Sequence, residues 1–187
     1  MVIPSLNASA QAALAAANPA GGDVVRLAAG EHFGPLQVGI NVEIEGAGAA
    51  ATTVVGGLVV GGNDILVRVD GVTLAGGLNG LAALGRSRVI VQNSVVRDSF
   101  SDGVLTADES DVTLFNTAVT GNGSLVSGNP IGAGISANGR SRVTTSIVRV
   151  SGNVNGGLAA RGEATLALGA LTEVSGNGSP AVLAALQ

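Results

Sequence analysis

The chain lacks most of the residues from which common catalytic and metal centres are built. Its 187 residues include no Cys, Trp or Tyr, three Phe and one His, His32. Without cysteine there is no disulfide and no thiolate metal site, and one histidine leaves little for an imidazole-based centre, so His32 is expected to be structural. All nine basic residues are Arg, charged residues make up 12% of the chain, and the net charge is −4. Nucleic acid is therefore not an expected partner.

Long apolar runs and a basic leader are also missing. Gly, Asn and charged residues interrupt every apolar run before it reaches about 18 residues, so no membrane span is expected. The first twenty residues contain no Lys or Arg and thus lack the basic region of a signal peptide. We expect a chain that is not secreted or one whose signal has already been removed.

Glycine is abundant, with 30 residues, and recurs at regular positions of a sequence repeat. Beyond residue 23, short apolar runs alternate with Gly, Asn, Ser and Asp, a pattern typical of strands and turns. Four segments align, beginning at Gly80, Gly103, Gly134 and Gly157. Their spacing is 23 residues except for an eight-residue insertion at Gly123 to Pro130, where we expect any partner contact, and one extra residue late in the last segment. Such repeats bury their apolar side chains only by stacking on one another.

The segment before the repeats predicts one short helix. Asn7 or Ser9 can cap the Ala-rich run from Ala10 to Ala17, and Asn18-Pro19 ends it. We therefore divide a single domain into residues 1–22, a capping helix and the turn that leads out of it, and residues 23–187, the stacked coils.

The repeat, together with the segment AQAALAAANPAGGDVVRLAAGEHFGPLQVGINVEIEGAGAAATTVVGG, resembles the right-handed parallel β-helix of the pectin-lyase-like superfamily. The resemblance implies an all-β solenoid of about seven coils with a short N-terminal capping α-helix. It also favours an extracellular or cell-surface location. Lyases, hydrolases, epimerases, adhesins, tail spikes and structural proteins share this fold, so the resemblance leaves the function open.

Stacking in register predicts which side chains face inward. In the first strand of each coil these are Leu81, Ala83, Val104, Thr106, Ile135, Ala137, Leu158 and Ala160; in the second they are Val89, Val91, Val112, Leu114, Val143, Thr145, Leu166 and Leu168. Small aliphatic residues suit a narrow interior, which explains the scarcity of aromatic residues.

Asparagines recur at equivalent turn positions. Asn93 and Asn116 align at one turn, and Asn122, Asn153 and Asn177 align at another, so we expect ladders of stacked amides. Asn7, Asn122 and Asn177 also lie in Asn-x-Ser sequons, which leaves glycosylation as the alternative.

The same register predicts outward columns of alternating charge. One column reads Arg86, Glu109, Arg140, Glu163, and a second reads Arg88, Asp111, Arg142, Thr165. Opposite charges on adjacent strands attract, so the columns disfavour slippage of the register. A similar step is expected between Glu45 and Arg68. With these charges assigned to structure, few remain for catalysis.

In the lyases and hydrolases that the chain resembles, acidic and basic side chains project from the outer face of the first strand. Here the corresponding positions are Ala82, Leu105, Ser136, Ala159 and Leu183, flanked by Leu84, Ala107, Asn138 and Arg161. No carboxylate pair converges there, as general acid–base chemistry requires. We therefore predict a non-catalytic structural module without a cofactor. It would form homo-oligomers through this flat face or through an uncapped C-terminal coil at residues 180–187.

Two alternatives stay open. The first is a carbohydrate-binding or polysaccharide-processing β-helix, for which the loop with Asp98, Phe100 and Asp102 could bind calcium or sugar together with Asp108 or Glu109. Arg161 could then be the counterpart of the arginine base of the resembling lyases. The weaker alternative is an ice-binding face, but its column Ile90, Thr113, Thr144, Ala167 is too mixed for a regular threonine rank.

Overall fold

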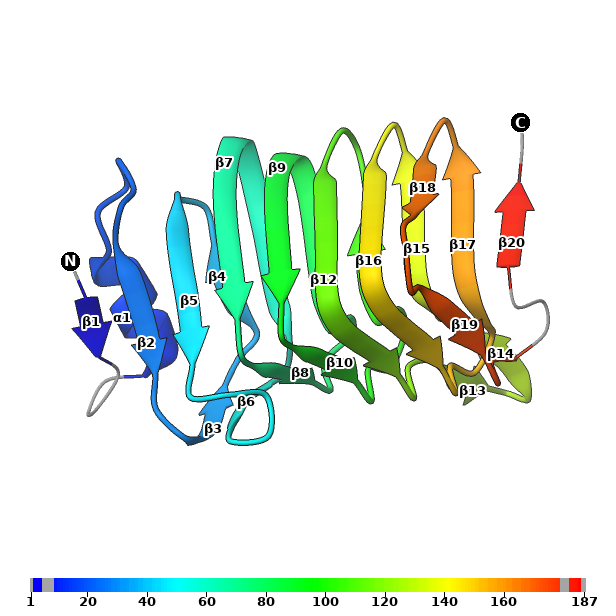
Figure 1. Cartoon of the computed structure of the whole chain (residues 1–187), viewed down its shortest axis with the longest axis horizontal. Helices are drawn as coiled ribbons and strands as arrows, with labels where there is room; N and C mark the ends of the chain where they lie inside the picture. The colour runs from blue at the N-terminus through cyan, green and yellow to red at the C-terminus, as the bar shows by residue number, and fades with distance from the viewer. Residues whose placement is uncertain (1, 5–8, 179–181, 186–187) are drawn as a thin grey trace.

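The chain is an elongated stack of coils, as seen in a computed structural model that describes residues 2–4, 9–178 and 182–185. The coils follow one another in sequence order from one end of the long axis to the other (Figure 1). Each coil adds one strand to each of three parallel sheets, numbered here in the order in which a coil of the repeat passes through them. The prediction of a parallel β-helix of about seven coils with a short helix near its N-terminus is confirmed.

The strands divide among the sheets as follows. Sheet 1 holds β4 (Leu36–Val38), the first parts of β7 (Leu58–Asp70) and β9 (Leu81–Gln92), β11 (Val104–Thr106), β15 (Ala133–Gly139), β17 (Gly156–Gly162) and β20 (Val182–Ala185). Sheet 2 holds β1 (Val2–Pro4), β2 (Val24–Leu27), β5 (Val42–Gly46), the second parts of β7 and β9, the first parts of β12 (Asp111–Thr120) and β16 (Arg142–Ser151), and β18 (Thr165–Leu168). Sheet 3 holds β3 (Gly30–Phe33), β6 (Thr52–Val55), β8 (Thr73–Ala75), β10 (Val95–Arg97), the second parts of β12 and β16, and β19 (Glu173–Ser175).

A continuous aliphatic column fills the interior. Of the sixteen predicted inward side chains, thirteen are buried, among them Leu81, Val112 and Ile135. Fully burying such a side chain contributes about 1.5–3 kcal/mol. Ala160 and Leu166 are only half-buried, and Leu168 is 50% exposed. Leu166 and Leu168 depart because, within the described residues, no further strand of sheet 2 covers β18, whereas Ala160 lies on β17 of sheet 1, next to β20.

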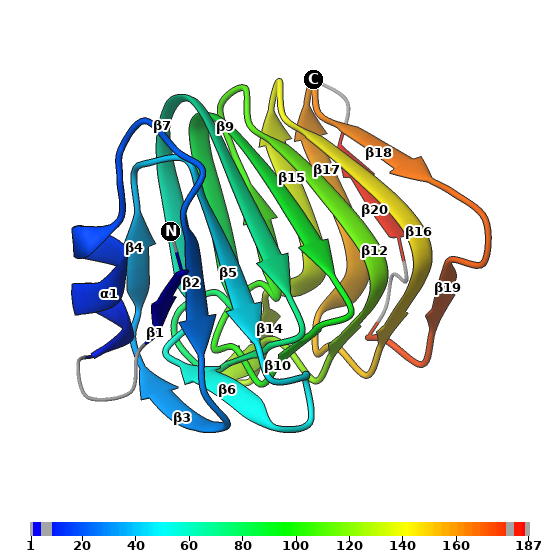
Figure 2. The ribbon, with the colours of Figure 1, turned by 60° about the vertical axis from the view of Figure 1, so that its left-hand side comes forward.

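Helix α1 (Ala10–Ala16) lies against the other end of the stack (Figure 2). Ser9 is its N-cap and accepts a hydrogen bond from the N–H of Ala12, as predicted, and the helix ends one residue before the predicted Ala17. The alternative cap, Asn7, lies outside the described residues. Gln11 ties the helix to β4, since its amide donates to the carbonyl of Gln37 (3.1 Å) and accepts from the N–H of Gln37 (2.8 Å). The helix therefore covers the first edge of sheet 1.

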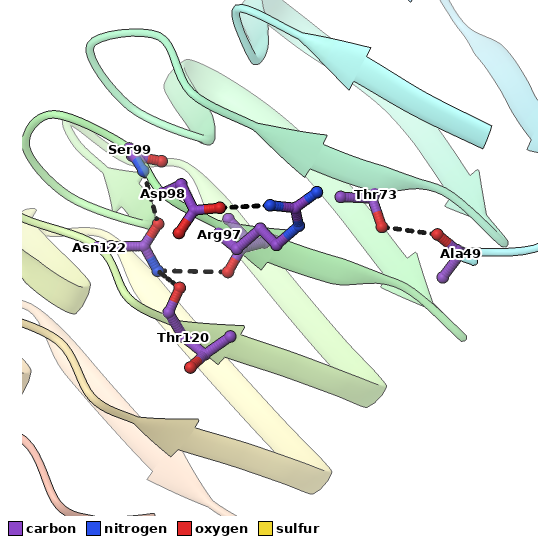
Figure 3. A network of polar contacts seen from close by, with 8 residues as sticks. Ala49, Thr73, Arg97, Asp98, Ser99, Thr120 and Asn122 are labelled. Atoms are coloured by element: carbon purple, nitrogen blue, oxygen red, sulfur yellow. Dashed lines mark hydrogen bonds and ion pairs between the residues drawn. The ribbon is translucent and has the colours of Figure 1, made fainter. Parts of the chain in front are cut away.

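Both predicted asparagine ladders are present. In the inner ladder, Asn122 Nδ2 donates to Asn153 Oδ1 (2.9 Å), and Asn153 Nδ2 donates to Asn177 Oδ1 (2.7 Å). In the outer ladder, Asn116 Nδ2 donates to Asn93 Oδ1 (2.8 Å). Figure 3 shows how Asn122 also accepts from the N–H of Ser99 and donates to the carbonyl of Thr120. Asn122 is fully buried, which makes it unsuitable for glycosylation in the folded chain.

The inner ladder explains the glycine directly before β11, Gly103, and the one at the start of β15, Gly134. A Cβ on Gly103 would lie 2.6 Å from Asn122 Nδ2, and one on Gly134 would lie 2.6 Å from Asn153 Nδ2. Only a residue without a side chain fits between the ladder and the neighbouring coil. Ser99 continues the ladder below Asn122 with a shorter side chain, and its buried Oγ has no hydrogen-bond partner.

The charge columns are in the predicted register, but their ion pairs differ. Arg88, Asp111 and Arg142 lie on successive strands as expected. Arg140 pairs with Glu109, whereas Arg86 pairs with Asp64 (2.9 Å), because a bulge in β7 brings Asp64 next to it. No ion pair joins Glu163 to Arg140 within the described part of the chain.

The predicted step between Glu45 and Arg68 is wrong. The bulge lengthens its coil, so the register places Arg68 opposite Glu43. Glu45 instead forms an ion pair with Arg26 (2.6 Å).

Candidate functional site

The outer face of sheet 1 is recessed. Strand pairing aligns Ala82, Leu105, Ser136, Ala159 and Leu183 in one rank, as predicted. However, Ala82, Ser136 and Ala159 are at most 6% exposed, Leu105 is half-buried, and the side chain of Leu183 lies outside the described residues. Two of the five positions, Ser136 and Ala159, thus line a hollow, and the use of this face for association stays a prediction. These side chains are small, and the turns that lead into sheet 1 stand beside them, so part of the face is the floor of a hollow.

The hollow has a volume of about 200 Å³ and crosses three coils. It is lined by Ser101, Asp102, Gly132, Ala133, Ser136, Asn155, Gly156, Leu158, Ala159 and Arg161. The turns before β11 and β17 contribute Asp102 and Asn155, and the strands β15 and β17 contribute Ser136 and Arg161. One carboxylate, one guanidinium, one amide and two serine hydroxyls thus meet in a single concave surface.

Asp102 is held firmly in the hollow. Its Oδ1 accepts hydrogen bonds from the N–H of Ala133 (2.8 Å) and from Ser136 Oγ (2.6 Å). Its own N–H donates to Oδ1 of Asn79 on the preceding coil (3.1 Å). These contacts set the position and direction of the carboxylate before any ligand arrives.

Arg161 reaches the hollow from β17, two strands beyond β11 in sheet 1. It follows Ala159 by two residues on β17 and is paired in register with Asn138, so its side chain projects from the same face of sheet 1. It is exposed, and no ion pair joins it to Glu163 or Asp102 among the residues that the structure describes. From the sequence, Asp102 was predicted in a calcium or sugar loop and Arg161 as a possible counterpart of an arginine base, with no link between the two. Aligning the turns that precede sheet 1, as well as its strands, could have brought the two together.

The proposed calcium loop does not assemble around one point. Asp98 forms an ion pair with Arg97 (Figure 3), whereas Asp102 points into the hollow. Asp108 accepts from the N–H of Gly85 (2.9 Å), and Glu109 pairs with Arg140. Phe100 is 53% exposed in the same loop. In residues 2–4, 9–178 and 182–185, no three His, Asp or Glu side chains gather as a metal-ion site.

The insertion directly precedes two of the residues that line the hollow. It folds as an antiparallel hairpin of β13 (Ser124–Val126) and β14 (Asn129–Ile131), and the chain returns to sheet 1 through Gly132 and Ala133. Ser124 Oγ donates to the carbonyl of Phe100 (2.8 Å), which fastens the hairpin to the neighbouring turn. His32 lies apart from this site on β3, where its Nε2 contacts the carbonyl oxygen of Ala28 (2.9 Å).

No helix in the described residues is long and apolar enough to cross a membrane. Comparisons by sequence find no matching protein-family model and no matching curated protein.

Comparison of the backbone with solved structures does find matches. One is the crystal structure of pectate lyase Pel9A, with a TM-score of 0.62 and 15% identity over 82% of this chain and 46% of the lyase. Another is alginate lyase from Paenibacillus sp. str. FPU-7, with a TM-score of 0.59 and 19% identity over 100% of this chain and 74% of that one. The chain thus spans less than half of the pectate lyase. At these identities the likeness concerns the path of the backbone and not the residues of a site.

Proposed function

Because the chain has the right-handed parallel β-helix fold of the pectin-lyase-like type, we propose that it binds an acidic carbohydrate in the hollow on sheet 1. The observation that carries the proposal is the meeting of Asp102, Ser136, Asn155 and Arg161 in one concave surface. Both solved structures with this backbone path are polysaccharide lyases by name, which supports the ligand class.

The chemistry of the hollow suits a sugar that carries a carboxylate. The guanidinium of Arg161 can donate two parallel hydrogen bonds to a carboxylate, a geometry that lysine cannot offer. The fixed carboxylate of Asp102 can accept hydrogen bonds from sugar hydroxyls, and Asn155 can donate and accept. The volume of about 200 Å³ accommodates about one sugar ring, so the rest of the oligosaccharide would extend along the face.

The proposal covers binding of the sugar and does not include cleavage of its glycosidic bond. General acid–base cleavage needs two titratable groups that converge on one bond. The hollow contains one carboxylate, that of Asp102, and one of its oxygens already accepts two hydrogen bonds. This arrangement supports holding an anionic sugar more directly than breaking its glycosidic bond.

The test is calorimetric titration with short oligomers of galacturonate, of the uronates of alginate, and of a neutral hexose. We expect the acidic oligomers to bind and the neutral one to bind at least tenfold more weakly. Arg161→Gln should weaken binding of the acidic oligomers by about 1.5–3 kcal/mol, roughly 10- to 150-fold in affinity, because one charge-assisted contact is lost.

Arg88→Gln is the matched control, since it removes an exposed arginine from sheet 2 without touching the hollow. An equal loss of affinity in both variants, or no preference for acidic oligomers, contradicts the proposal. The same mixtures should be examined for shortened, unsaturated products, which would extend the proposal from binding to lyase activity.

A further inference from the structure

A second cluster of surface side chains lies at the turn between sheets 2 and 3, away from the hollow. Large apolar residues are exposed there on three successive coils: Phe115 is 43% exposed, Ile147 41%, Leu168 50% and Leu171 79%. Two of them, Ile147 and Leu171, line a groove of about 450 Å³ that also contains Asn93, Asn116, Arg149 and Glu173. Exposed apolar side chains gathered in one place mark interaction surfaces more often than single ones do.

The backbone at this turn makes two of these apolar residues costly. Four successive turn positions have positive φ: Asn93 (50°), Asn116 (45°), Ile147 (54°) and Leu171 (57°). Asparagine tolerates this left-handed conformation, whereas a β-branched residue such as isoleucine is strongly disfavoured in it. Strained residues persist where the surrounding structure or a function requires them.

Folding alone would favour asparagine at position 147. The outer ladder runs from Asn93, which donates to Asp70 (2.9 Å), to Asn116, which donates to Asn93 (2.8 Å). Ile147 occupies the next step directly above Asn116, where another amide would continue the ladder. The structure instead places an exposed isoleucine in a strained conformation at the rim of an apolar groove.

The charged residues in the groove indicate which kind of partner would fit it. Arg149 and Glu173 face each other in register on β16 and β19, both exposed, and no ion pair joins them in the described ranges. A twofold axis between two such grooves would place Arg149 of one copy against Glu173 of the other, twice. Self-complementarity of this kind is the requirement for a symmetric dimer interface.

We propose that this groove is a surface for self-association, in which a second copy of the chain packs its Ile147 and Leu171 against those of the first. The strain at Ile147 is then retained because the apolar side chain serves the interface. This surface lies on a different side of the coil from the hollow of sheet 1, so association would leave the carbohydrate site accessible.

The test is sedimentation velocity of the whole chain from micromolar to millimolar concentration, combined with thermal unfolding at a low concentration at which the chain is monomeric. We expect a reversible dimer. Ile147→Asn should weaken it at least tenfold and at the same time raise the melting temperature, because asparagine accepts the positive φ and can extend the outer ladder. Loss of association together with a gain in stability is an outcome that general damage to the fold does not produce.

Charge exchange gives an independent readout. Arg149→Glu should weaken association, and the double variant Arg149→Glu/Glu173→Arg should restore it, because the exchange regenerates both intermolecular pairs. Leu125→Asn, a change at a more exposed apolar residue of the hairpin, should leave the dimer unchanged. A strictly monomeric wild-type chain, an Ile147→Asn dimer as tight as wild type, or a lower melting temperature for that variant would each overturn the proposal.

Discussion

At the scale of single residues, the chain uses small polar side chains to join coils that its aliphatic interior cannot align by itself. Aliphatic packing is non-directional and tolerates a shift between coils. An amide in the inner ladder does not tolerate such a shift, because its oxygen and its nitrogen contact different neighbours above and below. Asn153 shows this clearly, since it accepts from Asn122, donates to Asn177 (2.7 Å) and also donates to the carbonyl of Val119 (3.3 Å).

Removing the middle amide should therefore be costly. Asn153→Ala leaves the buried carbonyl of Val119 and the N–H of Asn122 without their partners. We expect a loss of about 2–4 kcal/mol in the free energy of unfolding, at about 1–3 kcal/mol for each buried group left unpaired. Chemical denaturation measures this value. Asn63→Ala, at an exposed position in the β7 bulge, is the control and should change it by less than about 0.5 kcal/mol.

At the scale of elements, the hairpin of β13 and β14 is the one departure from parallel pairing that the structure describes. It is joined to the coils at Gly123 and Gly132, and its strands pair only with each other. The alignment of Ala133 with Gly156 shows that the coil continues unchanged on the far side of the insertion. The hairpin therefore contributes little to the stack.

Deleting residues 125–132 should leave a folded solenoid. The join Gly123-Ser124-Ala133-Gly134 then has the same length as Val154-Asn155-Gly156-Gly157 on the next coil. We expect the free energy of unfolding to change by about 1 kcal/mol or less, because shortening a surface loop alters its closure entropy only slightly. Circular dichroism and thermal unfolding test this. Loss of the β spectrum would show instead that the hairpin is required for the coil to form.

At the scale of the whole molecule, Asp23 is the one charged residue buried among those that the structure describes, and the ion pairs are peripheral. The four pairs found among the described residues, Arg26–Glu45, Arg86–Asp64, Arg97–Asp98 and Arg140–Glu109, all involve arginine side chains at least 45% exposed. Exposed pairs contribute little to stability. Stability of the stack thus comes from aliphatic burial, parallel backbone pairing and the amide ladders.

Salt should accordingly have little effect on unfolding. Raising sodium chloride from about 0.05 to about 1 M shortens the screening length from more than 10 Å to about 3 Å, which weakens surface pairs. We expect the free energy of unfolding of the monomer to change by about 1 kcal/mol or less. A larger loss, measured by denaturant titration at both salt concentrations, would show that the charge columns hold the coils together.

Much of this architecture was predictable because it repeats. Periodicity identified the inward residues up to Ala137 and Val143, both ladders, and the insertion, since each depends on the spacing of residue types along the chain. The predictions were wrong where the 23-residue spacing of the coils is interrupted or where the stack ends. The bulge in β7 moved Arg68 away from Glu45, and the lack of a covering strand exposed Leu168. The hollow was missed because a turn residue, Asp102, reaches over a face whose own side chains are small and mostly uncharged.

Local spacing and residue size therefore specify the coil, its narrow aliphatic interior and its stacked amides, because each of these interactions recurs between equivalent positions of adjacent repeats. The recessed face, the meeting of Asp102 with Arg161 in one hollow, and the positive φ of Ile147 were decided only by the tertiary structure. These features join different positions of different coils, and their geometry depends on how far each turn extends beyond the sheets, a quantity that no repeating pattern encodes.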